Sequence, residues 1–192
     1  PVLTGWTADE ASSLYPPEVD PERYEKLARD RLGERTERYF SLYPRGETPA
    51  EAASSMQQAF TDRMGWGAHT LARVHAETTG EPTYLYQFAH APPGREAERY
   101  GAYHSSELVY VFDALEAIDR PWVPADRRLA DLISWSWIRF AEQGDPSSNL
   151  LADWPRYERR GDSIVVLGKE VERRPVLTPE KIRFLNAERL PE

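Results

Sequence analysis

Residues 101–112 read GAYHSSELVYVF, an apolar segment interrupted by one titratable side chain, His104. Gly101 indicates a turn before the histidine, and a short helix is expected from Ser105 onward. A histidine among apolar neighbours, with a serine beside it, can be a structural residue whose ring nitrogens are satisfied by hydrogen bonds. The same side chain could serve as a base in catalysis. The segment alone leaves both interpretations open.

The sequence on both sides of this segment predicts few strands and much helix. Alternation of Tyr84, Tyr86 and Phe88 predicts a strand over 83–88. Apolar runs predict two further strands, over 1–5 and 164–167. Capping residues, glycines and 3.6-residue spacing predict helices over 20–33, 35–43, 49–62, 68–78, 124–143 and 178–188.

Strands separated by long helical stretches imply crossover connections and a parallel sheet with helices on both faces. The expected fold class is therefore α/β, mostly helical with a few parallel strands. The stretch over about 20–79 is expected to be a helical insertion between the first two strands. Three strands make a small sheet for 192 residues, so most of the sheet is expected to lie outside this sequence.

The composition argues against several classes of function. A net charge of -8 disfavours a nucleic-acid partner, because that affinity rests on clustered Lys and Arg. The absence of Cys excludes disulfides and thiolate metal sites. No apolar run approaches the roughly 20 residues of a membrane span. No cofactor or metal is expected, and nothing indicates a cellular compartment.

The three other histidines give weak signals. His69 and His75 are six positions apart on one predicted helix, which places them about 120° apart around its axis. Helical zinc ligands are four positions apart and share a face, so a metal role is disfavoured. His90 is interpreted as a polar residue at the end of the strand over 83–88.

Glu10, in GWTADEASSL, also has two interpretations. Thr7 and Glu10 have the spacing of a capping box, in which the Glu side chain accepts a hydrogen bond from the cap amide. Alternatively, Glu10 could meet a histidine from a distant part of the chain, because a catalytic base needs an acid to orient it.

Five segments, in order, resemble the type-B carboxylesterases, the α/β-hydrolase family that includes the cholinesterases. GAYHSSELVYVF resembles the segment around the family's catalytic histidine, and PVLTGWTADEASSL resembles the strand and turn of its catalytic glutamate. The other three are EPTYLYQFAH, WSWIRFAEQGDPS and DWPRY. One departure is Ala11, where the family usually has Gly.

The resemblance implies a C-terminal portion of an α/β-hydrolase fold over 1–192, in which His104 is the base and Glu10 its acidic partner. Glu107 matches a position that often carries a further buried acid, although a carboxylate at a helix N-terminus is an equal alternative. In this fold the nucleophilic serine precedes the acid. No G-x-S-x-G occurs here, so the nucleophile is expected in an N-terminal portion that precedes Pro1.

The implied function is a serine-dependent carboxylic ester hydrolase, and this chain alone is expected to be inactive. Its expected partners are a small-molecule ester, the missing N-terminal portion and, through exposed strand edges, a second copy of itself. The alternative is a catalytically inactive hydrolase-like interaction module. Trp135 and Trp137 are expected in a helix interface, whereas Met64 and Trp66, in a loop between two helices, are candidates for an ester pocket.

Overall fold

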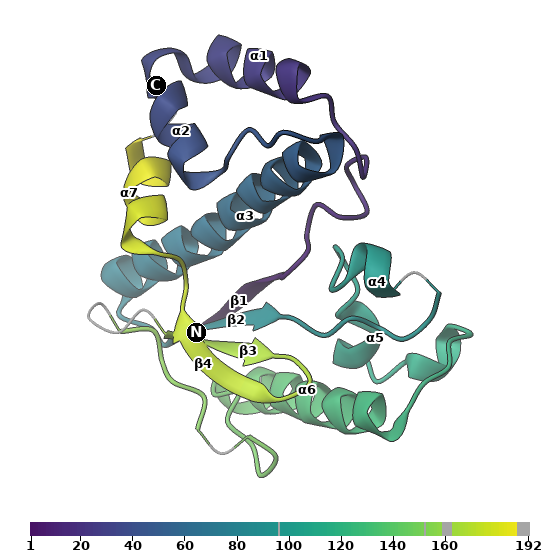
Figure 1. The fold of residues 1–192 in the computed structure, drawn as a ribbon. Helices are drawn as coiled ribbons and strands as arrows, with labels where there is room; N and C mark the ends of the chain where they lie inside the picture. The colour runs from purple at the N-terminus through teal and green to yellow at the C-terminus, as the bar shows by residue number, and fades with distance from the viewer. Residues whose placement is uncertain (96, 152, 159–162, 188–192) are drawn as a thin grey trace.

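The computed structural model describes residues 1–95, 97–151, 153–158 and 163–187. Within them, four strands form one sheet in the order β1-β2-β3-β4 (Figure 1). The strands are β1 (Val2–Thr7), β2 (Thr83–Phe88), β3 (Ser163–Leu167) and β4 (Val171–Pro175). The first three run parallel, whereas β4 is antiparallel to β3. The predicted α/β class with a few parallel strands is confirmed.

Helices cover both faces of the sheet (Figure 1). The two long covering helices are α3 (Pro49–Thr79) and α6 (Pro124–Gln143). On one face of the sheet, Phe88 of β2 lies in a buried cluster with Ile133 of α6. On the opposite face, Leu85 of β2 lies in a second buried cluster with Ala72 of α3. Each large apolar side chain buried in this way contributes about 1.5–3 kcal/mol. The alternation of side chains on β2 therefore attaches the sheet to both helices.

The helix α3 is continuous, so the prediction of two helices over 49–62 and 68–78 is wrong. Gly65 and Gly67 lie in the gap between the two predicted helices, and each glycine inside a helix costs about 1 kcal/mol relative to alanine. Packing explains the first of them. A Cβ atom on Gly65 would lie 2.8 Å from the Trp6 ring, so glycine allows the helix to approach β1 closely.

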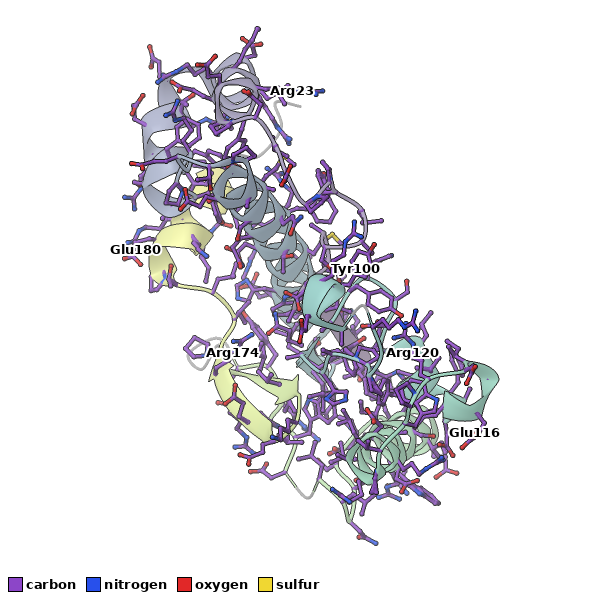
Figure 2. All side chains as sticks on the ribbon, turned by 45° about the vertical axis from the view of Figure 1, so that its right-hand side comes forward. Arg23, Tyr100, Glu116, Arg120, Arg174 and Glu180 are labelled. Atoms are coloured by element: carbon purple, nitrogen blue, oxygen red, sulfur yellow. The ribbon has the colours of Figure 1, made fainter. Side chains whose placement is uncertain are left out.

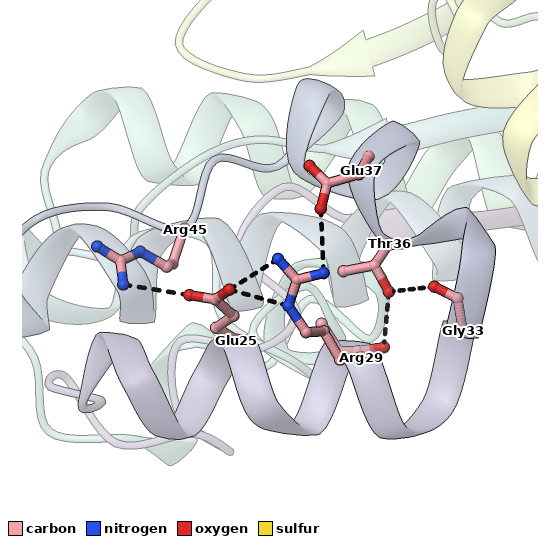
Figure 3. Close-up of polar contacts among 7 residues, drawn as sticks. Glu25, Arg29, Gly33, Thr36, Glu37 and Arg45 are labelled. Atoms are coloured by element: carbon pink, nitrogen blue, oxygen red, sulfur yellow. Dashed lines mark hydrogen bonds and ion pairs between the residues drawn. The ribbon is translucent and has the colours of Figure 1, made fainter.

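Shorter helices lie on the far side of α3 from the sheet (Figure 1). They are α1 (Pro21–Leu32), a 3-10 turn (Gly33–Arg35), α2 (Thr36–Leu42) and α7 (Pro179–Ala187). Leu32 and Phe184 are buried together in their core. On the surface, Arg29 bridges Glu25 of α1 and Glu37 of α2 (Figure 3). Because exposed ion pairs contribute about 0–1 kcal/mol each, the apolar core is the main stabilising contact.

The segment between β2 and α6 contains only short elements. These are α4 (Ala97–Tyr100), α5 (Leu108–Val111) and a 3-10 turn (Leu115–Ala117). The predicted bounds of β2 and α6 agree with the structure. The last predicted residue of the C-terminal helix, at 188, lies outside the described residues.

Two sequence predictions about side chains are corrected by the structure. Trp135 is 55% exposed on the outer face of α6, so it does not pack in a helix interface. Trp137 does pack, edge to face, against Tyr86 and Trp154. Met64 and Trp66 lie within α3 rather than in a loop.

Candidate active site

Glu10 and His104 meet at the carboxyl ends of two adjacent strands. β1 and β2 are paired in parallel, and Glu10 follows β1 by three residues. The segment that contains His104 follows β2. In open α/β sheets, the loops beyond the carboxyl ends of the strands form the functional sites. The sheet therefore delivers both side chains to the same edge.

The two carboxylate oxygens of Glu10 have different partners. Oε1 accepts a hydrogen bond from the Thr7 backbone N–H at 2.8 Å. Oε2 lies 2.6 Å from His104 Nδ1. The capping contact and the histidine contact, which the sequence offered as alternatives, thus coexist. No helix begins at Thr7, so the backbone contact fixes the Glu10 rotamer instead of capping a helix.

Exposure differs sharply between the two members of this pair. The Glu10 side chain is 4% exposed, whereas that of His104 is 50% exposed. Glu10 occupies Nδ1 of His104, and Nε2 has no hydrogen-bond partner among the described residues. A buried carboxylate thus orients a ring whose second nitrogen remains accessible. That is the arrangement a general base requires.

A second carboxylate, Asp9, locks the two loops together. The Asp9 N–H donates to the Ala102 carbonyl at 3.0 Å, and the Ala102 N–H donates to Asp9 Oδ2 at 2.8 Å. Gly101 has φ +57°, and a Cβ atom there would overlap the Asp9 carboxylate. Sequence reasoning missed Asp9, although its position directly before Glu10 was a usable signal.

The turn at His104 has a constrained backbone. Ser105 adopts φ +71°, a left-handed conformation that costs a non-glycine residue about 1–2 kcal/mol. The Ser106 N–H closes the turn on the Tyr103 carbonyl at 2.9 Å. Arg120 donates to the Tyr103 hydroxyl at 3.2 Å and to the Pro93 carbonyl at 3.0 Å. Figure 2 labels Arg120 and, at the end of α4, Tyr100.

Glu107 lies near the pair without a direct contact to it. Its side chain makes no cap to α5, and its Oε2 is buried without a hydrogen-bond partner in the described part of the chain. Burial raises the pKa of Glu107 and repulsion from Glu10 raises it further, against an opposing backbone hydrogen bond and the nearby His104. Burial, with Glu107 and Glu10, also raises the pKa of the Tyr86 hydroxyl. Glu107 and Glu10 therefore share one electrostatic environment.

A second histidine–carboxylate pair lies beyond the end of β2. His90 Nε2 is 2.6 Å from Asp126 Oδ1, and the Tyr110 hydroxyl donates to the same oxygen at 2.9 Å. The sequence indicated only a polar residue for His90. Asp126 was missed because its position in the first turn of α6 is also explained by helix capping, and its Oδ2 does accept the Val123 N–H at 2.9 Å.

The remaining candidates form no site among the described residues. His69 lies edge to face against Tyr157, and no group of three potential metal ligands occurs in the residues that the structure describes. Trp66 donates to Asn186 at 2.9 Å. A cavity of about 490 Å³ lies between α1, α2, α3 and α7, but neither Trp66 nor Met64 lines it. No helix in the described ranges has the length and apolar character needed to cross a membrane.

The fold, together with an acid and a histidine in contact at the carboxyl edge of the sheet, is that of the α/β-hydrolase class, and solved structures agree. A PNB esterase matches 95% of the chain with a TM-score of 0.71 and 25% identity, and a thermophilic PNB esterase matches 96% with a TM-score of 0.73 and 26% identity. The chain belongs to the carboxylesterase family, whose family model matches residues 8–185.

Two relatives illustrate how the chain compares with complete family members. The para-nitrobenzyl esterase of Bacillus subtilis (strain 168) is 28% identical over 94% of this chain. The fumonisin B1 esterase of Sphingopyxis macrogoltabida is 28% identical over 89% of it. The chain spans only 38% and 33% of the lengths of these two proteins.

Proposed function

We propose that this chain supplies the acid and the base of a serine-dependent carboxylic ester hydrolase. The observation that carries the proposal is the 2.6 Å contact between buried Glu10 and half-exposed His104. Membership of the carboxylesterase family supports the ester as the substrate class. The chain is proposed to be the C-terminal portion of one hydrolase domain, with the helices over about 20–79 as an insertion.

The proposed reaction is a double displacement. His104, through Nε2, takes the proton from the attacking serine hydroxyl as the acyl-enzyme forms, and it protonates the departing alcohol. In the second half, His104 takes a proton from the water that attacks the acyl-enzyme, and it returns that proton to the serine oxygen as the carboxylic acid is released. Glu10 accepts the Nδ1–H, fixes the tautomer and stabilises the imidazolium. Thr7 assists by holding the other carboxylate oxygen through its N–H at 2.8 Å.

The serine is proposed to lie before Pro1. No G-x-S-x-G occurs in the 192 residues, and the chain spans 38% of the length of the para-nitrobenzyl esterase. In α/β-hydrolases the nucleophile precedes the acid in the chain. The N-terminal portion that carries the serine is therefore the proposed intramolecular partner of this chain.

Glu107 is proposed to influence His104 through its charge. Burial raises its pKa and repulsion from Glu10 raises it further, whereas a backbone hydrogen bond and the nearby His104 oppose this rise.

The test uses the protein expressed together with the residues that precede Pro1 in its gene. Hydrolysis of p-nitrophenyl acetate or butyrate is expected, and His104→Ala should lower kcat by about 10⁴-fold or more. His75→Ala, on α3, is the matched control and should retain activity. The chain over 1–192 alone should show no saturable turnover.

Three results would contradict the proposal. If 1–192 alone turns over and His104→Ala abolishes this, the chain contains an unrecognised nucleophile. If His104→Ala leaves the longer protein fully active, His104 is not the base. If the longer protein binds esters without turnover, the inactive interaction module becomes the better description.

A further inference from the structure

Asp126 joins three elements that follow one another along the chain. It lies in the first turn of α6 and its side chain is 1% exposed. His90, just after β2, lies 2.6 Å from its Oδ1, and Tyr110, on α5, donates to that same oxygen at 2.9 Å. Its Oδ2 accepts the Val123 N–H, so both carboxylate oxygens are occupied.

The two residues that contact Asp126 Oδ1 are the first and the last residue of the segment 90–110, which contains His104. His90 begins this segment and Tyr110 ends it, twenty positions later in the printed sequence. Between them, the described residues form one short helix, a single bridge from Tyr103 to Asp9 and the turn at Ser105 before the chain enters α5. A segment with so little regular structure depends on ties at its ends, since closing it as a free loop costs conformational entropy.

We propose that Asp126 is a positioning residue for His104, acting by fastening both ends of the segment 90–110 to one carboxylate oxygen. The relevance of Asp126 to catalysis rests on the proposed function. The effect of Asp126 on the Glu10–His104 contact does not depend on that function. His90 and Tyr110 are the two arms of this arrangement, named here the Asp126 tie.

The connection from Asp126 to His104 is short and continuous. Tyr110 follows His104 by six residues, and its N–H donates to the Glu107 carbonyl at 3.0 Å. The Leu108 N–H donates to the Ser105 carbonyl at 3.3 Å, which links α5 to the turn of His104. A displacement of Tyr110 therefore reaches His104 through consecutive backbone hydrogen bonds.

Charge and packing strengthen the Asp126 tie. Burial alone raises the pKa of Asp126, but hydrogen bonds from Val123, His90 and Tyr110 outweigh it and hold the pKa below its usual range. Asp126 is therefore an anion that strengthens each hydrogen bond it accepts. The rings of His90 and Tyr110 also pack edge to face, with centroids 5.6 Å apart. The two arms thus support each other.

The experiment observes the His104 ring proton directly, in the chain over 1–192. The Nδ1–H that is bonded to Glu10 gives a downfield proton resonance, assigned by its loss in Glu10→Gln. Asp126→Asn keeps the shape of the side chain but removes one acceptor oxygen. Exchange of the His104 proton with water should become about tenfold faster, corresponding to the loss of one charge-assisted hydrogen bond.

A milder pair of variants protects the test against unfolding. Tyr110→Phe removes one hydroxyl and should accelerate the exchange in the same direction. His90→Leu should do so as well, and His90→Gln, whose amide can still donate to Asp126, should restore slow exchange. Since both arms act through Asp126, Tyr110→Phe should add nothing to Asp126→Asn.

The matched control is Asp62→Asn. Asp62 is also buried, and it pairs with Lys181 of α7 and with Gln58, away from the segment of His104. The inference is overturned if Asp62→Asn accelerates the exchange equally, since the effect would then report general destabilisation. It is also overturned if folded Asp126→Asn and Tyr110→Phe leave the exchange unchanged.

In the longer, serine-containing protein, Asp126→Asn should lower kcat about tenfold with KM unchanged, because only the alignment of the base is altered. If the ring proton responds as described while His104→Ala has no effect on hydrolysis, the proposed function fails and the Asp126 tie stands. If hydrolysis depends on His104 but the exchange rate of its ring proton is unchanged in Asp126→Asn, the proposed function stands and the Asp126 tie fails.

Discussion

The pairs Glu10–His104 and Asp126–His90 have the same separation of 2.6 Å, but they differ in their surroundings. The His104 side chain is 50% exposed, against 16% for His90. The carboxylate of Asp126 accepts a tyrosine hydroxyl on the oxygen that also binds His90, whereas Glu10 Oε2 serves His104 alone among the described residues.

A short histidine–carboxylate contact therefore does not by itself define a catalytic site. Both carboxylates are buried and both orient a ring. In the open pair, Glu10–His104, the histidine side chain is half exposed, so its second nitrogen is accessible to solvent, whereas the His90 side chain of the other pair is largely buried. The closed pair, Asp126–His90, has the features of a structural tie.

The largest expected effect on stability is at the closed pair. Asp126→Ala should lower the free energy of unfolding by about 3–5 kcal/mol, because it leaves the buried Tyr110 hydroxyl, the largely buried His90 ring and the Val123 N–H without their acceptor. Glu10→Ala should cost only about 1–2 kcal/mol, since half-exposed His104 can be hydrated instead. Urea unfolding of both variants measures the difference. A larger loss for Glu10→Ala would contradict the distinction between the two pairs.

Gly101→Ala should disturb the open pair next most strongly. Gly101 combines φ +57° with the close approach of the Asp9 carboxylate, so the methyl group brings both backbone strain and a steric clash. A loss of about 2–3 kcal/mol is expected. Gly80→Ala is the control, because Gly80 has φ +71° but open space around it. It should cost about 1 kcal/mol and leave the His104 ring proton unchanged. Equal losses in urea unfolding would mean that the Asp9 contact is unimportant.

Glu107→Gln tests the electrostatic environment of the open pair through the pH dependence of stability. Because the folded pKa of Glu107 lies above its usual value of 4.5, its stabilising contribution is fully present below that pH. It is lost as pH rises through the folded pKa. Replacing Glu107 by Gln should therefore reduce the loss of stability between acid and neutral pH.

Glu51→Gln provides a control of opposite sign. Backbone hydrogen bonds at the start of α3 lower the pKa of Glu51, so its contribution is present above the usual value of 4.5 and lost as pH falls. Unfolding curves at several pH values should separate the two variants. If both change the pH dependence in the same direction, the environment assigned to Glu107 is wrong.

Most of the fold could be predicted from local sequence patterns. The alternation on β2 and the periodicity of α6 gave the observed bounds, because β2 packs against a helix on each face and α6 buries one face in the same core. β4 was missed, since all its residues are exposed and the sequence VERRP has no apolar alternation. The interruption predicted near Gly65 failed because packing against Trp6 overrides the low helix propensity of glycine.

The candidate site could be predicted only in part. Glu10 and His104 came from the family resemblance, and their contact depends on the pairing of β1 with β2, which single motifs do not encode. Asp9 and Asp126 were missed because their roles come from partners distant in sequence. Asp126 lies 36 positions from His90, and Asp9 lies 93 positions from Ala102.

Whether Glu10 and His104 act as one unit is decided by a double-mutant cycle in the longer protein that is proposed to carry the serine. The rate to measure is kcat for a p-nitrophenyl ester in Glu10→Gln, His104→Ala and the double variant. Residues of a catalytic unit are strongly non-additive, so the double variant should be no slower than His104→Ala alone. If the two losses multiply instead, Glu10 does not act through His104, and the account of the site is wrong.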